Sequence, residues 1–297
     1  MAGDDERRKD QELPTMEEIL AKVKELPPLP GVVHRVVPMI QDPEVEIREL
    51  AKVLSTDQAL TARILKLANS AFYGFPRRIS TVMDAIVLLG LRTLKGLIYA
   101  IALYDYYDKP TPGYGMKRGD LWRHALATGV AARTVASDIR RLDPEEAFVC
   151  GLLHDIGKTV LETYVIEAFE QIYTKVVEDG KTFAEAEREV LGFDHAELGA
   201  KVVEQWNLPE VFSQAILHLY RPLEAPEEFR LMAAVVHLAN HASLALGIGM
   251  AVDGTSGGLD PGVLELIGKD EGYLSDLLDR LQASLSDLEE LAVMEAA

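Results

Sequence analysis

Three side chains that could take part in chemistry lie close together in the sequence at the end of an apolar run. Residues 151–158 read Gly-Leu-Leu-His-Asp-Ile-Gly-Lys, so His154, Asp155 and Lys158 supply an imidazole, a carboxylate and an ammonium group. The spacing predicts that they lie within two turns of one helix and point into one cleft. Imidazole nitrogen and carboxylate oxygen suit zinc, iron or manganese, but two ligands do not complete a metal site. The simpler interpretation is a helix end with a partly buried histidine and a capping aspartate.

The other histidines suggest where further ligands could come from. Six of the seven histidines follow residue 123. Four of them fall on separate predicted helices: His124, His154, His195 and His218. Imidazoles buried at helix ends cost free energy unless a partner satisfies them. We therefore expect these four rings to converge beside Asp155, around either a bound metal or a hydrogen-bonded polar core.

The composition is that of an acidic globular protein. The chain has 297 residues, 48% of them hydrophobic, which is enough for one large core or two modest ones. Its formal net charge of −18 disfavours a nucleic acid duplex or an anionic membrane as partner. No apolar stretch is expected to reach the roughly 20 residues that span a bilayer. Cys150 is the sole cysteine, so no internal disulfide forms and we expect a cytoplasmic location.

Helical periodicity runs through most of the chain and predicts an all-α fold. Apolar residues recur at spacings of three and four, and no alternating strand pattern of useful length interrupts them. The clearest helices are predicted over residues 15–26, 31–41, 121–139, 145–156, 163–178, 195–206, 209–218, 227–246 and 274–294.

Two capping boxes mark helix starts in the second half of the chain. Each pairs an N-cap residue with a glutamate three positions later, namely Thr182 with Glu185 and Asp194 with Glu197. The second box places His195 in the first turn of its helix. This position leaves the ring near a helix end, where a site can form.

A loop of helix breakers divides the helices into two groups. Residues 109–115 read Lys-Pro-Thr-Pro-Gly-Tyr-Gly, which predicts a boundary between two packed helical bundles. The first bundle is expected over residues 14–115 and the second over residues 116–297, ending in an acidic amphipathic helix. Residues 1–13 are charged and aperiodic, which predicts a disordered tail.

The order of the polar residues in the second bundle resembles the HD superfamily of metal-dependent phosphohydrolases and its HD-GYP branch. The resemblance implies that the metal ligands are His124, His154, Asp155, His195, His218 and, in the last position, Asn240. An aspartate is expected there, and an amide offers one neutral oxygen in its place, which argues against a two-metal centre and leaves room for one ion. The glycine-tyrosine-proline signature is missing, because the chain reads Leu-Tyr-Arg-Pro at residues 219–222.

Motifs in the first bundle are similar to those of the HDOD family, the HD-related output domain of bacterial signalling proteins. They are Leu-Pro-Pro-Leu-Pro at residues 26–30 and the longer stretches at residues 55–74 and 79–90. The resemblance covers residues 26–246 and implies a regulatory module in which the HD ligands have frequently been lost. The 25 residues before it are too few for a receiver domain, so we expect none in this chain.

Two functions follow from the resemblance. The first is a bacterial signal-transduction protein that acts on a protein partner and keeps a remnant HD pocket for a divalent iron, manganese or zinc ion. The alternative is a metal-dependent phosphohydrolase acting on a nucleotide or another phosphoester. In that enzyme the metal would activate water and polarise a phosphoryl oxygen, with Asp155 and Lys158 as catalytic residues.

Several interpretations stay open at this stage. Lys158 either protonates a leaving oxygen and holds a phosphate, or is a solvated charge. Asn240 is either a weak ligand or a hydrogen-bond partner of an imidazole. His237 and His241 have the spacing of a metal pair, but no acid or cysteine lies near, so we interpret them as rim histidines. A plain scaffold that dimerises through residues 274–294 is a third function.

Overall fold

A computed structural model describes residues 15–23, 31–249, 258–284 and 287. Its regular elements are all helices, joined by turns and loops. These residues form no strand, and one isolated bridge joins Thr111 to Met116. The all-α prediction is therefore confirmed. The helices are α1 (Met16–Val23), α2 (Gly31–Gln41), α3 (Ile47–Ser55), α4 (Gln58–Ala68), α5 (Val82–Tyr107), α6 (Asp120–Ile139), α7 (Pro144–Leu153), α8 (Ile156–Val177), α9 (Phe183–Leu191), α10 (His195–Gln205), α11 (Glu210–Leu217), α12 (Glu227–Ala245), α13 (Pro261–Ile267) and α14 (Gly272–Ala283). Three short 3₁₀ turns are η1 (Ala71–Tyr73), η2 (Pro112–Tyr114) and η3 (Pro222–Glu224).

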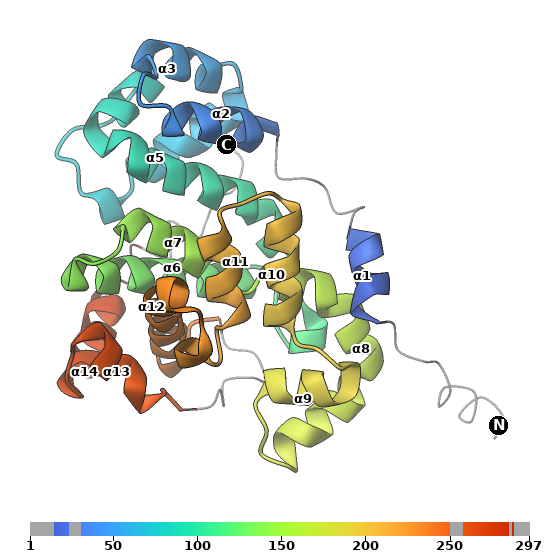
Figure 1. Cartoon of the computed structure of the whole chain (residues 1–297). Coiled ribbons are helices and arrows are strands. Elements are labelled where there is room, and N and C mark those ends of the chain that lie inside the picture. Colours follow the sequence, from blue (N-terminus) through green and yellow to red (C-terminus); the bar gives the residue numbers. More distant parts are fainter. Residues whose placement is uncertain (1–14, 24–30, 250–257, 285–286, 288–297) are drawn as a thin grey trace.

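Two groups of helices meet along α5 (Figure 1). Helices α2, α3 and α4 pack against α5, while α6, α7 and α12 form the centre of the second group. Helix α1 lies against α10, so the first described helix contacts the second group. The loop at residues 109–115 contains η2, which packs on α8.

Helix α5 is kinked at Gly90. Gly90 has φ 80° and ψ 163°, a conformation that essentially only glycine adopts. By length and composition α5 is apolar enough to cross a membrane, with a mean hydropathy of 1.8 over an 18-residue window. The expectation that no apolar stretch is long enough is therefore wrong for this helix. More than half of that window, 56%, is buried inside the fold, which is typical of a core helix.

Both predicted capping boxes are present. The Thr182 hydroxyl accepts from the Glu185 backbone N–H, and the Glu185 side chain accepts from the Thr182 backbone N–H. The same reciprocal pair joins Asp194 and Glu197 at the start of α10. His195 is the first residue of α10, as the sequence predicts.

The prediction that one helix carries the His-Asp-Lys motif is wrong. Helix α7 ends at Leu153, His154 is its C-cap, and α8 begins at Ile156 after Asp155. Close backbone contacts explain the break. A Cβ on Gly151 would lie 2.6 Å from the Cα of Gly129, and a Cβ on Gly157 would collide with the carbonyl oxygen of His195. The two glycines thus let α7 and α8 press against separate neighbours, and the chain must turn between them.

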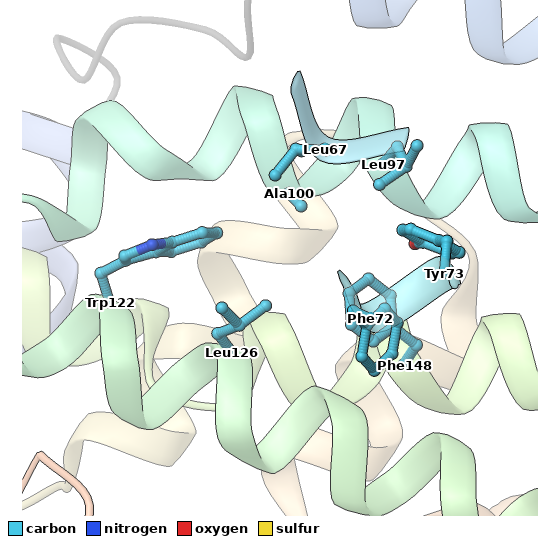
Figure 2. Close-up of a pocket in the computed structure, with 8 residues that line it drawn as sticks. All are labelled: Leu67, Phe72, Tyr73, Leu97, Ala100, Trp122, Leu126 and Phe148. Carbon is cyan, nitrogen blue, oxygen red and sulfur yellow. The ribbon is translucent and has the colours of Figure 1, made fainter. Parts of the chain in front are cut away.

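A small apolar cavity lies where the two helix groups meet (Figure 2). Its walls come from α4, η1 and α5 on one side and from α6 and α7 on the other: Leu67, Phe72, Tyr73, Leu97, Ala100, Trp122, Leu126 and Phe148. Beside it, the Arg133 guanidinium of α6 lies 5.5 Å from the Phe72 ring centroid and pairs with Glu145 of α7 at 2.8 Å. Aromatic and ionic contacts therefore close the junction around an apolar gap.

Two predicted terminal segments fall partly or wholly outside the described residues. The predicted tail at residues 1–13 lies outside them. The predicted helix over residues 274–294 corresponds to α14, which begins at Gly272 and ends at Ala283. Residues 288–297 also lie outside the described part.

Candidate metal centre

Three potential ligands from two parts of the second bundle converge in the core. Ligand atoms of His124, His154 and Asp155 all lie within 4.8 Å of one another. His124 comes from the first turns of α6, and the other two come from the junction of α7 and α8. All three are buried, with at most 1% of each residue exposed.

The hydrogen bonds of the two imidazoles determine which nitrogens face each other. A carbonyl oxygen only accepts, so Nδ1 of His154 donates to Gly151 O at 2.6 Å and Nδ1 of His124 donates to Ile248 O at 3.1 Å. In the neutral rings both Nε2 atoms are therefore acceptors, and they lie 3.2 Å apart. Two lone pairs at this separation repel unless a proton or a metal ion lies between them.

The carboxylate of Asp155 lies beside these two nitrogens. Its Oδ2 is 3.4 Å from His154 Nε2 and 3.6 Å from His124 Nε2, and the Lys158 ammonium lies 3.0 Å from the same oxygen. Burial alone would raise the pKa of Asp155, but His154, Lys158 and His124 together hold that pKa well below its ordinary value. The carboxylate is thus kept as an anion inside the core.

Lys158 is buried, with 2% of the residue exposed, so its interpretation as a solvated charge is wrong. It stands in the first turn of α8, and its ammonium faces Asp155 and lies 5.6 Å from the Tyr114 ring centroid. Lys158 therefore supplies the positive charge nearest to the carboxylate in the described part of the chain.

Two further predicted ligands border the cluster. His195 Nε2 lies 3.6 Å from the other carboxylate oxygen, Asp155 Oδ1. The side-chain oxygen of Asn240, on α12, lies 3.0 Å from His124 Nε2. The structure therefore brings His124, His154, Asp155, His195 and Asn240 into one neighbourhood.

His218 is not joined to this neighbourhood. It is the C-cap of α11 and half-buried, and its Nδ1 donates to Gln214 O at 2.9 Å. No hydrogen bond or ion pair among the described residues links it to the other ligands. His237 is buried and donates from Nδ1 to Leu219 O at 2.8 Å, so it is a core residue and not a rim histidine.

Three residues that the sequence did not single out complete the surroundings of His195. The Glu187 carboxylate, from α9, accepts from His195 Nδ1 at 2.6 Å, and the Tyr220 hydroxyl lies 2.7 Å from His195 Nε2. The Tyr114 hydroxyl donates to Glu187 at 2.6 Å. Burial alone would lower the pKa of His195, but Glu187 outweighs it and raises that pKa. No periodic pattern points to these residues, because they lie far apart in the chain.

The donor set fits one divalent metal ion. Both carboxylate oxygens of Asp155 are buried and have no well-formed hydrogen bond within the described residues. They adjoin imidazole nitrogens whose other ring nitrogen is held by a carbonyl or a carboxylate, the usual arrangement around metal-binding histidines. With Asp155 as the sole carboxylate in the cluster, the charge balance supports one ion and not two.

A small pocket opens beside the cluster. It is lined by Lys158, Thr182, Phe183, Ala184, Tyr220, Asn240 and Leu244. Polar groups from α8, α12 and the start of α9 therefore face the same space. Fold and site together define an all-helical protein with an HD-type histidine–aspartate pocket.

The family model of the HDOD domain matches residues 26–222. The chain therefore belongs to the HDOD family. A solved HDOD domain protein of unknown function from Geobacter sulfurreducens is 28% identical with a TM-score of 0.77, and the match covers 99% of this chain and 100% of that one.

Two other relatives extend this picture. A solved candidate phosphohydrolase from Shewanella amazonensis SB2B is 26% identical with a TM-score of 0.72, over 93% of this chain and 97% of that one. An uncharacterized protein of Treponema pallidum (strain Nichols) is 28% identical over 232 residues, 75% of this chain and 43% of the relative. The chain thus spans less than half the length of that relative.

Proposed function

We propose that this HDOD protein is a regulatory module of a signalling pathway whose HD pocket binds one divalent metal ion. Family membership supports the regulatory role, and the facing lone pairs of His124 and His154 beside Asp155 carry the metal assignment. His195 and Asn240 are the additional ligands in this proposal. Iron, manganese and zinc all suit a set dominated by imidazole.

The pocket supports binding better than hydrolysis. Asn240 stands where a second carboxylate would be expected, and the Lys158 ammonium is directed at Asp155, 3.0 Å away. A bound metal would act as a Lewis acid toward an oxygen of a ligand. The residues around it would orient that ligand, but no second carboxylate in the cluster is available as a base.

A metal-dependent phosphohydrolase is the second candidate function, and the adjacent pocket favours it. The space beside the cluster is lined by Lys158, Asn240 and Tyr220, which could bind the oxygens of a nucleotide or another phosphoester. The likeness to the candidate phosphohydrolase from Shewanella amazonensis points the same way. In this function Asp155 would hold the metal, and Lys158 would bind the phosphate or protonate the leaving oxygen.

Metal analysis combined with a phosphodiesterase screen tests both functions. The purified protein should contain or take up about one equivalent of divalent metal, and Asp155→Ala should lose it. His218→Ala is the matched control, because that histidine is not joined to the cluster, and it should keep the metal. Metal retained by Asp155→Ala would contradict the site. Turnover of a phosphoester that disappears in Asp155→Ala would replace the regulatory function by the enzymatic one.

The partner in this proposal is a protein. The net charge of −18 argues against a nucleic acid duplex. A cytoplasmic location is part of the same proposal, because the lone cysteine, Cys150, is buried and unpaired.

A further inference from the structure

A buried carboxylate that the proposed function does not use stands behind His195. Glu187 on α9 is fully buried. One of its oxygens accepts from both the ring Nδ1 and the backbone N–H of His195, at 2.6 and 2.9 Å. Two contacts with the same residue fix the position of the ring relative to the start of α10.

The other oxygen of Glu187 accepts a hydrogen bond from the loop that joins the two helix groups. Tyr114, in η2, is fully buried and donates its hydroxyl to this oxygen at 2.6 Å. The Tyr114 ring also lies edge-on to the His195 ring, with centroids 6.1 Å apart. Glu187 thus accepts three hydrogen bonds, which is what a buried carboxylate requires.

Gly113 allows Tyr114 to reach this position. A Cβ on Gly113 would lie 3.0 Å from Glu162 O and 3.1 Å from the backbone nitrogen of Ile166, both in α8. The Gly113 N–H also donates to the Glu162 side chain at 2.9 Å. The loop at residues 109–115, which the sequence marks only as a boundary, is therefore pressed onto α8 beside the HD pocket.

These contacts decide which nitrogen of His195 faces the cluster. With Nδ1–H donated to Glu187, the ring presents Nε2 to Asp155 Oδ1, 3.6 Å away, and to the Tyr220 hydroxyl at 2.7 Å. Rotation of the ring by half a turn would break the hydrogen bond to Glu187 and turn Nε2 away from Asp155. A carboxylate behind a histidine is a general way to orient a metal ligand and fix its tautomer.

We propose that Glu187, itself held by Tyr114, is a positioning residue that aims Nε2 of His195 at the metal site beside Asp155. This inference rests on the proposed metal binding. In this proposal the loop at residues 109–115 helps to support the pocket through Tyr114. Neither Tyr114 nor Glu187 would contact the metal ion.

Zinc affinity of the full chain, measured by competition with a fluorescent chelator, tests the proposal. Glu187→Gln should weaken Zn²⁺ binding about 10- to 100-fold, and Tyr114→Phe about 2- to 10-fold, since it removes one hydrogen bond. Tyr273→Phe is the matched control. It also removes a tyrosine hydroxyl that donates to a carboxylate, that of Asp138 on α6 at 2.7 Å, but this pair includes no residue of the metal site. It should leave the affinity unchanged.

A second readout separates positioning from a merely structural role. Because Glu187 raises the pKa of His195, nitrogen NMR of the metal-free protein is recorded above that pKa, where the ring is neutral, and should show His195 protonated on Nδ1 in the wild type. Both tautomers should be populated in Glu187→Met, which leaves no acceptor for Nδ1–H. Circular dichroism checks that each variant is folded.

The outcomes distinguish this proposal from the proposed function. If the wild type binds no Zn²⁺, the metal site and this role both fail. If the wild type binds Zn²⁺ but Glu187→Gln and Tyr114→Phe bind it equally well, the metal site stands and the positioning role is overturned. An unchanged His195 tautomer in Glu187→Met also overturns it.

Discussion

Replacing Lys158 by methionine should destabilise the metal-free protein and make its stability depend on metal. The Lys158 ammonium lies 3.0 Å from Asp155 Oδ2, and both residues are buried. Methionine has a similar length and no charge, so it removes the ion pair with little change in packing. The Asp155 carboxylate would then keep only the imidazoles around it.

The expected loss follows from the distance. Two unit charges 3.0 Å apart attract by about 5.5 kcal/mol at an effective dielectric constant of about 20, before the cost of desolvation is subtracted. Removing one partner of a buried ion pair costs about 3–5 kcal/mol, because the other charge stays buried. Protonation of Asp155 relieves part of this cost, so we expect the free energy of unfolding to fall by about 3 kcal/mol.

Urea unfolding with a chelator, on the wild type, Lys158→Met, Asp155→Asn and the double variant, measures this effect. The double variant should be more stable than the sum of the single changes predicts, by about 2 kcal/mol. Zn²⁺ at about 100 times its Kd stabilises a protein by about 2.7 kcal/mol. Since Zn²⁺ would also replace the missing charge, it should bind Lys158→Met more tightly than the wild type. Additive single changes and an equal response to Zn²⁺ would refute this reasoning.

Three other changes have defined outcomes. Gly157→Ala should cost about 3 kcal/mol or more in urea unfolding, since its Cβ would collide with His195 O; a loss under about 1 kcal/mol would contradict the close packing. Gly90→Ala should cost about 1–3 kcal/mol because of the positive φ at the kink, and an unchanged unfolding midpoint would contradict it. Burial lowers the pKa of His237 from its ordinary 6.5, so the unfolded chain takes up a proton first as the pH falls. The free energy of unfolding should therefore fall between about pH 7.5 and about pH 5.5, and this fall should be smaller in His237→Gln.

Local signals predicted the helices well where short-range contacts decide the structure. The helix over residues 31–41 has the predicted bounds, and both capping boxes are formed. Each box depends on side chains three residues apart, so no tertiary information is needed.

The turn between His154 and Asp155 could not be predicted in this way. It depends on glycines at residues 151 and 157 that allow close contact with α6 and α10. Helical periodicity continues through the turn, so the sequence predicts one helix where two meet. The consequence for the site is direct, since the turn lets the imidazole and the carboxylate face the same point.

In the candidate site, too, some features could be predicted from the sequence and others depend on tertiary contacts. The sequence predicts a gathering of imidazoles beside Asp155, and the structure brings His124, His154 and His195 there. Family resemblance also implied His218, which lies at the end of α11 and donates to its own helix. The support from Glu187 could not be found from the sequence, because a buried glutamate in an amphipathic helix has no distinctive pattern.

The cavity between the two helix groups makes the contact between them sensitive to pressure (Figure 2). A gap lined by apolar side chains offers water no hydrogen bonds, and unfolding eliminates the gap, so the folded state has the larger volume there. Hydrostatic pressure therefore weakens the contact between the groups. A bulkier side chain in place of Ala100 would occupy part of the gap and make the contact between the two groups less sensitive to pressure.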